Sequence, residues 1–255
     1  MKLWITSILT IIVVLSSACS SVFAEQNHKV AIVIDDFGNN MKGTDLMLSL
    51  PIPLTAAVMP FLPSTKKDAK SAHEKGYEVI VHLPMEPRQG KASWLGPNAI
   101  TTDLSDKEIR RRVLAAIDDV PYAIGINNHM GSKATADERV IRIVLSVCKE
   151  RGLFFLDSKT NYRSIVSKIG NELGVPVIEN KLFFDDFYTR NHIEKQSELL
   201  LEKVNIEPTV VIIGHVGPPG EMTANVIKDY IPRIKQKADF VFLSQLVDEL
   251  PIPLH

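Results

Sequence analysis

The chain has 255 residues, of which 45% are hydrophobic, 23% are charged and 7% are aromatic. Its 29 Lys and Arg residues nearly balance 30 Asp and Glu residues, which excludes a nucleic-acid-binding protein with a broad basic surface and an acidic disordered chain. Because the chain has only 2 Cys, it has neither a disulfide framework nor a cysteine-based zinc site, so any metal must be held by His and carboxylate ligands.

The first 24 residues have the pattern of a secretory signal peptide. Lys2 supplies a short positive region, residues 3–15 are mostly apolar, and small residues lead to a cleavage site after Ala24. This apolar run is shorter than the about 20 residues that a membrane-spanning helix needs, so we expect no stable membrane span after cleavage. The alternatives are an uncleaved anchor and a lipoprotein signal at Cys19. We therefore expect an exported protein that is secreted, periplasmic or cell-wall associated, with one domain over residues 25–255.

Apolar runs rich in β-branched and aromatic residues alternate with helical patterns along the rest of the chain. This alternation predicts an α/β fold, a single distorted (β/α) barrel with seven or eight mostly parallel strands, and a doubly wound sheet is the alternative. The predicted strands cover residues 30–34, 55–59, 78–81, 122–126, 153–156, 175–178, 209–213 and 240–243. The predicted helices cover residues 64–76, 105–117, 136–151, 163–173, 193–204 and 223–236.

Polar side chains that can bind a metal or a proton follow most of the predicted strands. In a (β/α) barrel the carboxyl ends of all strands open onto one face, so we expect these side chains to converge although they lie far apart in the sequence. In chain order they are Asp35 and Asp36, His82, Asn127, Asn128 and His129, Asp157 and Ser158, Glu179 and Asn180, and His215.

The acidic pair at 35–36 and two of these histidines fit a metal site. At the end of a strand both carboxylates can face the mouth of the barrel, where one binds a metal and the other accepts a proton, although the same sequence also suits a plain turn. His82 and His129 would complete a His₂–carboxylate site with open positions, which suits Zn²⁺ and other divalent metals. Each histidine alone is more typical of a hydrogen-bonded structural residue.

His215 is a candidate proton donor, whereas two other motifs are expected to be structural. It lies in a glycine-rich turn with little bulk around the ring, which suits a proton donor beside a substrate; the alternative is a loop histidine with no role. The second acidic pair, Asp185 and Asp186, lacks a long strand before it, so we interpret it as a loop or helix cap. Cys148 lies in a helical apolar pattern and is expected to be a buried core thiol.

Three of these segments resemble motifs of the polysaccharide deacetylases, in particular their divergent bacterial branch. The segments are residues 33–36 (Val-Ile-Asp-Asp), 76–82 (Gly-Tyr-Glu-Val-Ile-Val-His) and 211–215 (Val-Ile-Ile-Gly-His). The resemblance extends from about residue 30 to residue 250 and implies a distorted (β/α) barrel, although the family's Arg-Pro-Pro-Tyr segment is not recognisable.

The resemblance assigns roles to the main site residues. It implies that Asp35 is the general base, that His215 is the general acid, and that Asp36 and His82 bind the metal. His129 is the third metal ligand that we favour, because residues 127–132 resemble a motif of the divergent branch.

Other residues receive supporting roles or remain alternatives. The second histidine of the family's histidine motif falls on Glu86, which is therefore the other candidate for the third ligand. Asp157 resembles an acidic motif that orients the base and its neighbours. Asn128 is placed with Glu86 and Asp157 among the supporting or substrate-binding residues.

The resemblance implies metal-dependent hydrolysis that removes N- or O-acetyl groups from an extracytoplasmic glycan, such as a cell-wall polysaccharide. The expected cofactor is a divalent metal, Zn²⁺ in the first place, and no nucleic-acid partner is expected. One alternative is a non-catalytic relative that binds a glycan or an envelope partner. Another is the cleavage of a different amide or ester at the same metal site.

Overall fold

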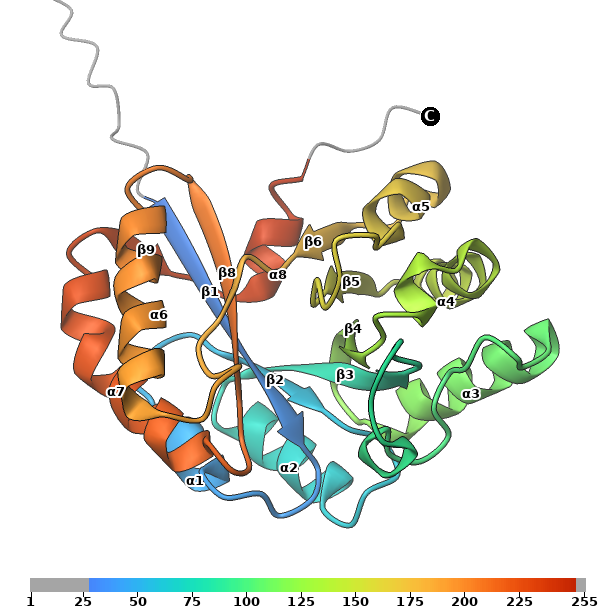
Figure 1. Cartoon of the computed structure of the whole chain (residues 1–255), viewed down its shortest axis with the longest axis horizontal. Coiled ribbons are helices and arrows are strands. Elements are labelled where there is room, and N and C mark those ends of the chain that lie inside the picture. Colours follow the sequence, from blue (N-terminus) through green and yellow to red (C-terminus); the bar gives the residue numbers. More distant parts are fainter. Residues whose placement is uncertain (1–27, 251–255) are drawn as a thin grey trace, which may run out of the picture.

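The computed structural model describes residues 28–250, so the predicted signal peptide lies outside the described residues. Within this range nine parallel strands form one curled sheet, with helices packed around it (Figure 1). The strand order is β6-β5-β4-β3-β2-β1-β8-β7, and β9 pairs with the first residues of β1. The strands are β1 (His28–Phe37), β2 (Thr55–Val58), β3 (Glu78–Met85), β4 (Ala123–Met130), β5 (Phe154–Asp157), β6 (Val177–Glu179), β7 (Leu182–Phe183), β8 (Thr209–His215) and β9 (Ala238–Phe240).

Helices connect most of the successive strands, and several begin at side-chain caps. The side chains of Ser105, Asp137 and Thr189 each accept a hydrogen bond from the backbone N–H three residues later, which satisfies a donor of the first helical turn. None of the helices in the described range is long and apolar enough to cross a membrane. The helices are α1 (Thr44–Met47), α2 (Thr65–Glu74), α3 (Asp106–Asp119), α4 (Glu138–Arg151), α5 (Val166–Leu173), α6 (Arg190–Lys203), α7 (Gly220–Ile234) and α8 (Leu243–Val247).

The two faces of the sheet have different partners. In β1, Val30, Ile32 and Ile34 belong to the outer core beneath the helices, whereas Ala31 and Val33 belong to a separate inner core. Strand side chains and residues in and beside α8 make up this inner core, whereas a doubly wound sheet would have helices along both faces. The predicted single distorted (β/α) barrel is therefore confirmed, as an open barrel whose sheet ends at β6 and β7.

The last predicted strand, at residues 240–243, has the wrong bounds, and only its first residue belongs to a strand. Strand β9 ends at Phe240, and Leu243 already begins α8. This short helix lies against the start of the sheet, because the Ser244 side chain donates a hydrogen bond to Glu78 at the first residue of β3. The apolar residues after β9 therefore form a short helix at the amino end of the barrel instead of continuing the strand.

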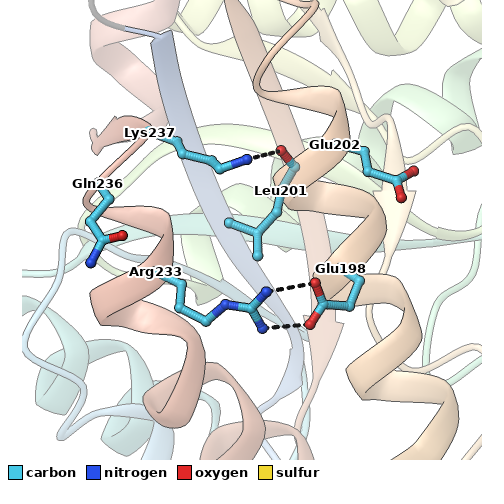
Figure 2. A pocket seen from close by; sticks show the side chains of 6 residues that line it. All are labelled: Glu198, Leu201, Glu202, Arg233, Gln236 and Lys237. Carbon is cyan, nitrogen blue, oxygen red and sulfur yellow. Dashed lines mark hydrogen bonds and ion pairs between the residues drawn. The ribbon is translucent and has the colours of Figure 1, made fainter.

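Charged side chains join α6 and α7 on the outside of the barrel (Figure 2). The guanidinium of Arg233 on α7 donates two hydrogen bonds to the carboxylate of Glu198 on α6, and Lys237 Nζ lies 3.5 Å from the backbone oxygen of Leu201. These residues border a hollow of about 170 Å³. Since Arg233 and Glu198 satisfy each other, we interpret the hollow as a contact between neighbouring helices and not as a site.

Candidate metal centre and active site

The inner face of the sheet changes from apolar to polar at the carboxyl ends of the strands. Asp35, His82 and His215 each lie two residues beyond an inward-facing apolar residue of β1, β3 and β8. Asp35 and His82 are buried, and His215 is partly exposed. In the pairing of β1 with β8, Asp35 is the direct partner of His215. The fold therefore brings these predicted residues together.

Asp36 reaches the same place through a local distortion of β1. Regular alternation would point it outward with Ile34, but its φ of 70° lies in the left-handed region that favours glycine. The register between β1 and β2 also shifts between Ile34 and Phe37. Such strain is characteristic of functional sites, and here it lets two consecutive carboxylates face one centre.

Asp36, His82 and His129 form a compact group of possible metal ligands. Asp36 Oδ1 lies 3.3 Å from His82 Nε2 and 3.1 Å from His129 Nδ1, and the two nitrogens are 3.0 Å apart. Two atoms that each lie about 2.0–2.1 Å from a tetrahedral Zn²⁺ are about 3.3 Å apart, so one ion between the three atoms requires only small adjustments.

The hydrogen bonds of the two imidazoles favour a cation in this group. His82 Nδ1 lies 2.8 Å from Asn127 Oδ1, and His129 Nε2 lies 2.9 Å from the backbone oxygen of Trp94. Because a carbonyl oxygen only accepts, these nitrogens carry the protons, and the nitrogens facing Asp36 present lone pairs in the neutral rings. Asp36 Oδ1 is itself buried without a hydrogen-bond donor among the described residues. Three acceptors that face one another fit a bound metal.

The pKa values of Asp36 and His82 are shifted in directions that favour a positive charge in this group of ligand atoms. Burial by itself would raise the pKa of Asp36, but the facing imidazoles of His129 and His82 outweigh it and hold this pKa well below its usual range. Burial by itself would lower the pKa of His82, but the carboxylates of Asp35 and Asp36 raise it. Both directions follow from one arrangement, in which carboxylates and imidazoles face one another and favour a positive charge between them.

Asn127 connects the metal group to the predicted base. It is fully buried, and its Nδ2 donates a 2.8 Å hydrogen bond to Asp35 Oδ1 while its Oδ1 accepts from His82. Burial raises the pKa of Asp35 despite the neighbouring imidazoles of His82 and His215. One amide thus orients both a metal-facing imidazole and a carboxylate, a role that the sequence pattern did not indicate for Asn127.

Asp185 is a second residue whose role the sequence pattern did not reveal. It lies in the loop between β7 and α6, as expected, but it is more than a loop residue, because the side chain is buried and bonded to His215. Asp185 Oδ1 lies 2.7 Å from His215 Nδ1, and Oδ2 accepts from the His215 backbone N–H and from Thr223 Oγ1. Burial by itself would lower the pKa of His215, but the hydrogen bond and charge of Asp185 raise it to about 10. The strand before Asp185, β7, has only two residues and gives no recognisable pattern.

Glu86 supports the loops around this group. Its carboxylate accepts hydrogen bonds from Thr102 and Lys133, so it is engaged away from the metal group. Of the two candidates for the third ligand, the structure therefore brings His129 and not Glu86 to the other two.

The remaining two supporting residues are bonded to loop residues and not to Asp35. The Asp157 carboxylate accepts hydrogen bonds from Ser164 Oγ and the Lys159 backbone N–H. Asn128 donates to the Met130 backbone oxygen and accepts from the Ser158 backbone N–H. These contacts fix the loops that follow β4 and β5, and Asn127 is the amide that contacts Asp35.

A cleft of about 570 Å³ opens beside Asp36 and His129. Its walls are mostly apolar, and two of its side chains, Trp94 and Tyr188, are 58% and 59% exposed. Cavities of this size accommodate small organic groups and commonly have apolar walls with a few polar groups. Two of the three predicted metal ligands, Asp36 and His129, therefore lie on the wall of an accessible cleft.

Solved structures share this fold. Protein ATU2773 from Agrobacterium tumefaciens C58 superposes with a TM-score of 0.79 at 19% identity, covering 86% of this chain and 89% of that one. The catalytic domain of the peptidoglycan N-acetylglucosamine deacetylase from Eubacterium rectale ATCC 33656 superposes with a TM-score of 0.52 at 15% identity, covering 90% and 93% of the two chains. At these identities the likeness concerns the fold alone.

Sequence comparison extends the likeness to the family. The uncharacterized protein YibQ of Escherichia coli (strain K12) is 34% identical over 221 residues, which are 87% of this chain and 68% of that protein. The family model described as divergent polysaccharide deacetylase matches residues 32–247, which include Asp35, Asp36, His82, His129 and His215. On this match, the chain belongs to the divergent polysaccharide deacetylase family.

Proposed function

We propose that this protein is a metal-dependent hydrolase that removes N- or O-acetyl groups from a glycan. The observation that carries the proposal is the convergence of three ligand atoms, from Asp36, His82 and His129, within 4.8 Å of one another. The flanking positions of Asp35 and His215, which are direct partners across β1 and β8, support it. Together they supply a metal site, a base and an acid.

The donor set suits a catalytic divalent cation. Two imidazoles and one carboxylate leave open positions in the coordination sphere, as catalytic zinc sites do, so Zn²⁺ is the metal that we propose. A divalent cation held there would acidify a water molecule and polarise the acyl carbonyl of the substrate.

The residues of the chain supply the proton transfers. Asp35, held by the amide of Asn127, accepts the proton of the attacking water. His215, held by Asp185, donates a proton to the departing amine or alkoxide. The ring of His215 stacks against Phe183 at 6.0 Å between ring centroids, and its side chain is partly exposed, so a leaving group can reach it. Base and acid thus come from neighbouring strands at the same end of the barrel.

The proposed substrate is an extracytoplasmic glycan, such as a cell-wall polysaccharide. This location rests on the signal-peptide pattern of residues 1–24. It can be checked by fractionating cells that express the full chain with a C-terminal tag. Recovery of the tagged chain in the cytosol at its uncleaved mass would contradict export.

The activity is tested by measuring acetate release from acetylated chito-oligosaccharides and from peptidoglycan, with the full chain loaded with Zn²⁺. We expect Asp35→Asn to lower kcat/KM by about 10²–10⁴-fold while the metal content stays at one per chain. His73→Ala is the matched control, because His73 lies exposed on α2 and stacks on Tyr122, outside the candidate site.

Two results would overturn the proposal. If the full chain binds no divalent metal when one is supplied, the metal-dependent mechanism fails. If it binds metal and the oligosaccharides but releases no acetate from any acetylated glycan tested, the non-catalytic glycan-binding alternative replaces the hydrolase.

A further inference from the structure

The cleft beside the metal group has a lining that selects for an uncharged ligand. Among the described residues that line it, the ionisable groups are Asp36, His129 and the phenol of Tyr188, and the first two face the metal position. Met41, Met59, Leu62, Trp94 and Met130 supply most of the remaining wall. Lys91 Nζ lies 5.5 Å from the centroid of the Trp94 ring, so a cationic ligand would meet a like charge there, whereas an uncharged ring with an apolar face can pack against such a wall.

Trp94 is the most prominent side chain of this wall. More than half of its surface is exposed, although large aromatic side chains usually bury most of theirs. Trp94 ends a short 3-10 helix, Ala92–Trp94, in the long connection between β3 and α3, and glycines with positive φ, Gly90 and Gly96, lie on either side of it. The connection therefore presents the indole to the cleft, and residues other than glycine at positions 90 and 96 would strain its backbone.

The backbone of Trp94 is hydrogen-bonded to His129, one of the possible metal ligands. His129 Nε2 donates its proton to the Trp94 carbonyl oxygen at 2.9 Å, and His129 Nδ1 faces Asp36. The connection is otherwise fixed near its two ends, where Glu86 and Ile100 share a backbone hydrogen bond and Arg88 contacts Ser132. The position of the indole thus depends on a ring that faces the metal position.

We propose that Trp94 is a stacking platform for an uncharged, N-acetylated sugar ring, and that metal binding at Asp36, His82 and His129 strengthens the binding of this sugar. A cation on His129 Nδ1 makes the Nε2–H a stronger donor, so it tightens the bond to the Trp94 carbonyl and orders the platform. Coupling of this kind is reciprocal, so the sugar strengthens metal binding by the same factor. The inference rests on the proposed function for the choice of a glycan.

The chain offers a direct probe of this platform. It contains 2 Trp, Trp4 and Trp94, so Trp4→Phe leaves Trp94 as the only indole in the full chain. Indole fluorescence of this variant is titrated with an oligomer of N-acetylglucosamine, once after chelation and once with Zn²⁺ at saturation. We expect a saturable change in emission, and a dissociation constant that is about 5- to 150-fold lower with Zn²⁺. In calorimetric titrations with Zn²⁺, the dissociation constant for Zn²⁺ should fall by the same factor when the sugar is present.

Variants and a second ligand distinguish stacking on Trp94 from nonspecific binding of the sugar. Trp94→Ala should weaken sugar binding roughly tenfold by calorimetry, because the stacked ring is lost. Tyr162→Ala is the matched control, since Tyr162 is an aromatic side chain that is 85% exposed and does not line the cleft. The cationic oligomer of glucosamine should bind more weakly than its acetylated counterpart.

Several results would overturn the inference. Equal sugar affinity in Trp94→Ala and the parent protein would contradict stacking on Trp94. A sugar affinity that is the same with and without Zn²⁺ would contradict the coupling. Binding of a medium-chain acyl group in place of the sugar would show that the cleft takes an acyl chain. Acetate release without a response of Trp94 would leave the proposed function standing and defeat the inference. Metal-coupled sugar binding without acetate release would support the inference and contradict the proposed hydrolase function.

Discussion

The two histidine groups of this site differ in the oxygen that each imidazole contacts. His82 and His129 give their outer N–H groups to neutral oxygens, the Asn127 side chain and the Trp94 backbone. His215 instead gives its Nδ1 proton to a buried carboxylate, that of Asp185. A neutral acceptor fixes the tautomer and leaves the second nitrogen free to bind a metal, whereas a carboxylate stabilises the doubly protonated ring. This difference in the second contact supports the proposal that His82 and His129 bind a metal and that His215 donates a proton.

The carboxylates differ in the same way. Asp36 belongs to the metal group, and its Oδ1 is buried without a donor among the described residues. Asp35 beside it accepts a hydrogen bond from Asn127, and Asp185 accepts three, one of them from the ring of His215. A carboxylate with unfilled acceptor capacity suits a cation, and one held by donors suits an orienting role. Substitutions at these residues can test the contrast, and their effects should range from loss of the metal to a shift in one pKa.

Removing a metal ligand should have the largest effect. His129→Ala leaves two ligands, Asp36 and His82, so we expect the loss of bound metal at equimolar protein and Zn²⁺, and with it all acetate release. Metal content after gel filtration measures this, and circular dichroism checks that the chain is folded. His73→Ala, with its exposed imidazole on α2, should keep one metal per chain. Retention of a full metal equivalent by His129→Ala would mean that another residue is the third ligand.

Removing the proton donor should reduce activity and leave the metal in place. His215→Gln removes the ionisable ring, so we expect kcat/KM for acetate release to fall by about 10²–10⁴-fold. Metal content should stay at one per chain, because His215 is not in the group of ligand atoms around Asp36. If metal is lost together with activity, His215 is a ligand and the contrast between the two histidine groups is wrong.

The sequence was sufficient to predict the barrel and the residues at its mouth, because strand–helix alternation and polar strand ends are local patterns. It was not sufficient to predict which side chain of a polar pair faces the site. In β5, Phe154 and Phe155 are both buried, one in each core, since a parallel strand in a barrel is covered on both faces and loses its polar alternation. Without that alternation, Asp157 could not be assigned to a face from the sequence.

The neighbours Asn127 and Asn128 show the same limit. They lie side by side on β4, and only the packed strand reveals that Asn127 shares the face of His129 and contacts Asp35. Asp36 is the opposite case, since alternation would point it outward and a φ of 70° turns it in. Asp185 was missed because two residues of β7 are too few to show a pattern.

The amide contact can be tested by truncating Asn127. Asn127→Ala leaves His82 Nδ1 and Asp35 Oδ1 without their shared partner, so both tautomer and orientation are less well fixed. We expect the dissociation constant for Zn²⁺ to rise by about 10–100-fold, as for other residues that orient metal-bound histidines. Isothermal titration calorimetry measures it. The comparison variant is Asn128→Ala, which removes an amide of the same size that is bonded to the loops, and it should weaken the metal less. Equal losses in both variants would mean that Asn127 acts through general stability alone.

The carboxylate contact can be tested at His215 with a smaller expected effect on rate. Asp185→Asn keeps the size of the side chain but removes its charge, so only the carboxylates of Asp36 and Asp35 still oppose burial, and the pKa of His215 should fall from about 10. At pH 7.5 a smaller fraction of the rings would then be protonated, so acetate release should fall, by less than in His215→Gln. The pKa is followed by NMR titration of the His215 ring after chelation.

The same substitution should change how stability depends on pH. In the parent protein the folded-state pKa of His215, about 10, lies above the unfolded value of about 6.5. The protonated ring therefore contributes stability in full below about pH 6.5, and this contribution is lost as the pH rises through about 10. In Asp185→Asn this loss should be smaller, so urea midpoints at pH 7 and pH 10 should lie closer together than in the parent. If the pKa of His215 stays near 10 without the carboxylate, Asp185 does not set the charge of this ring, and the contrast with His82 and His129 loses its physical basis.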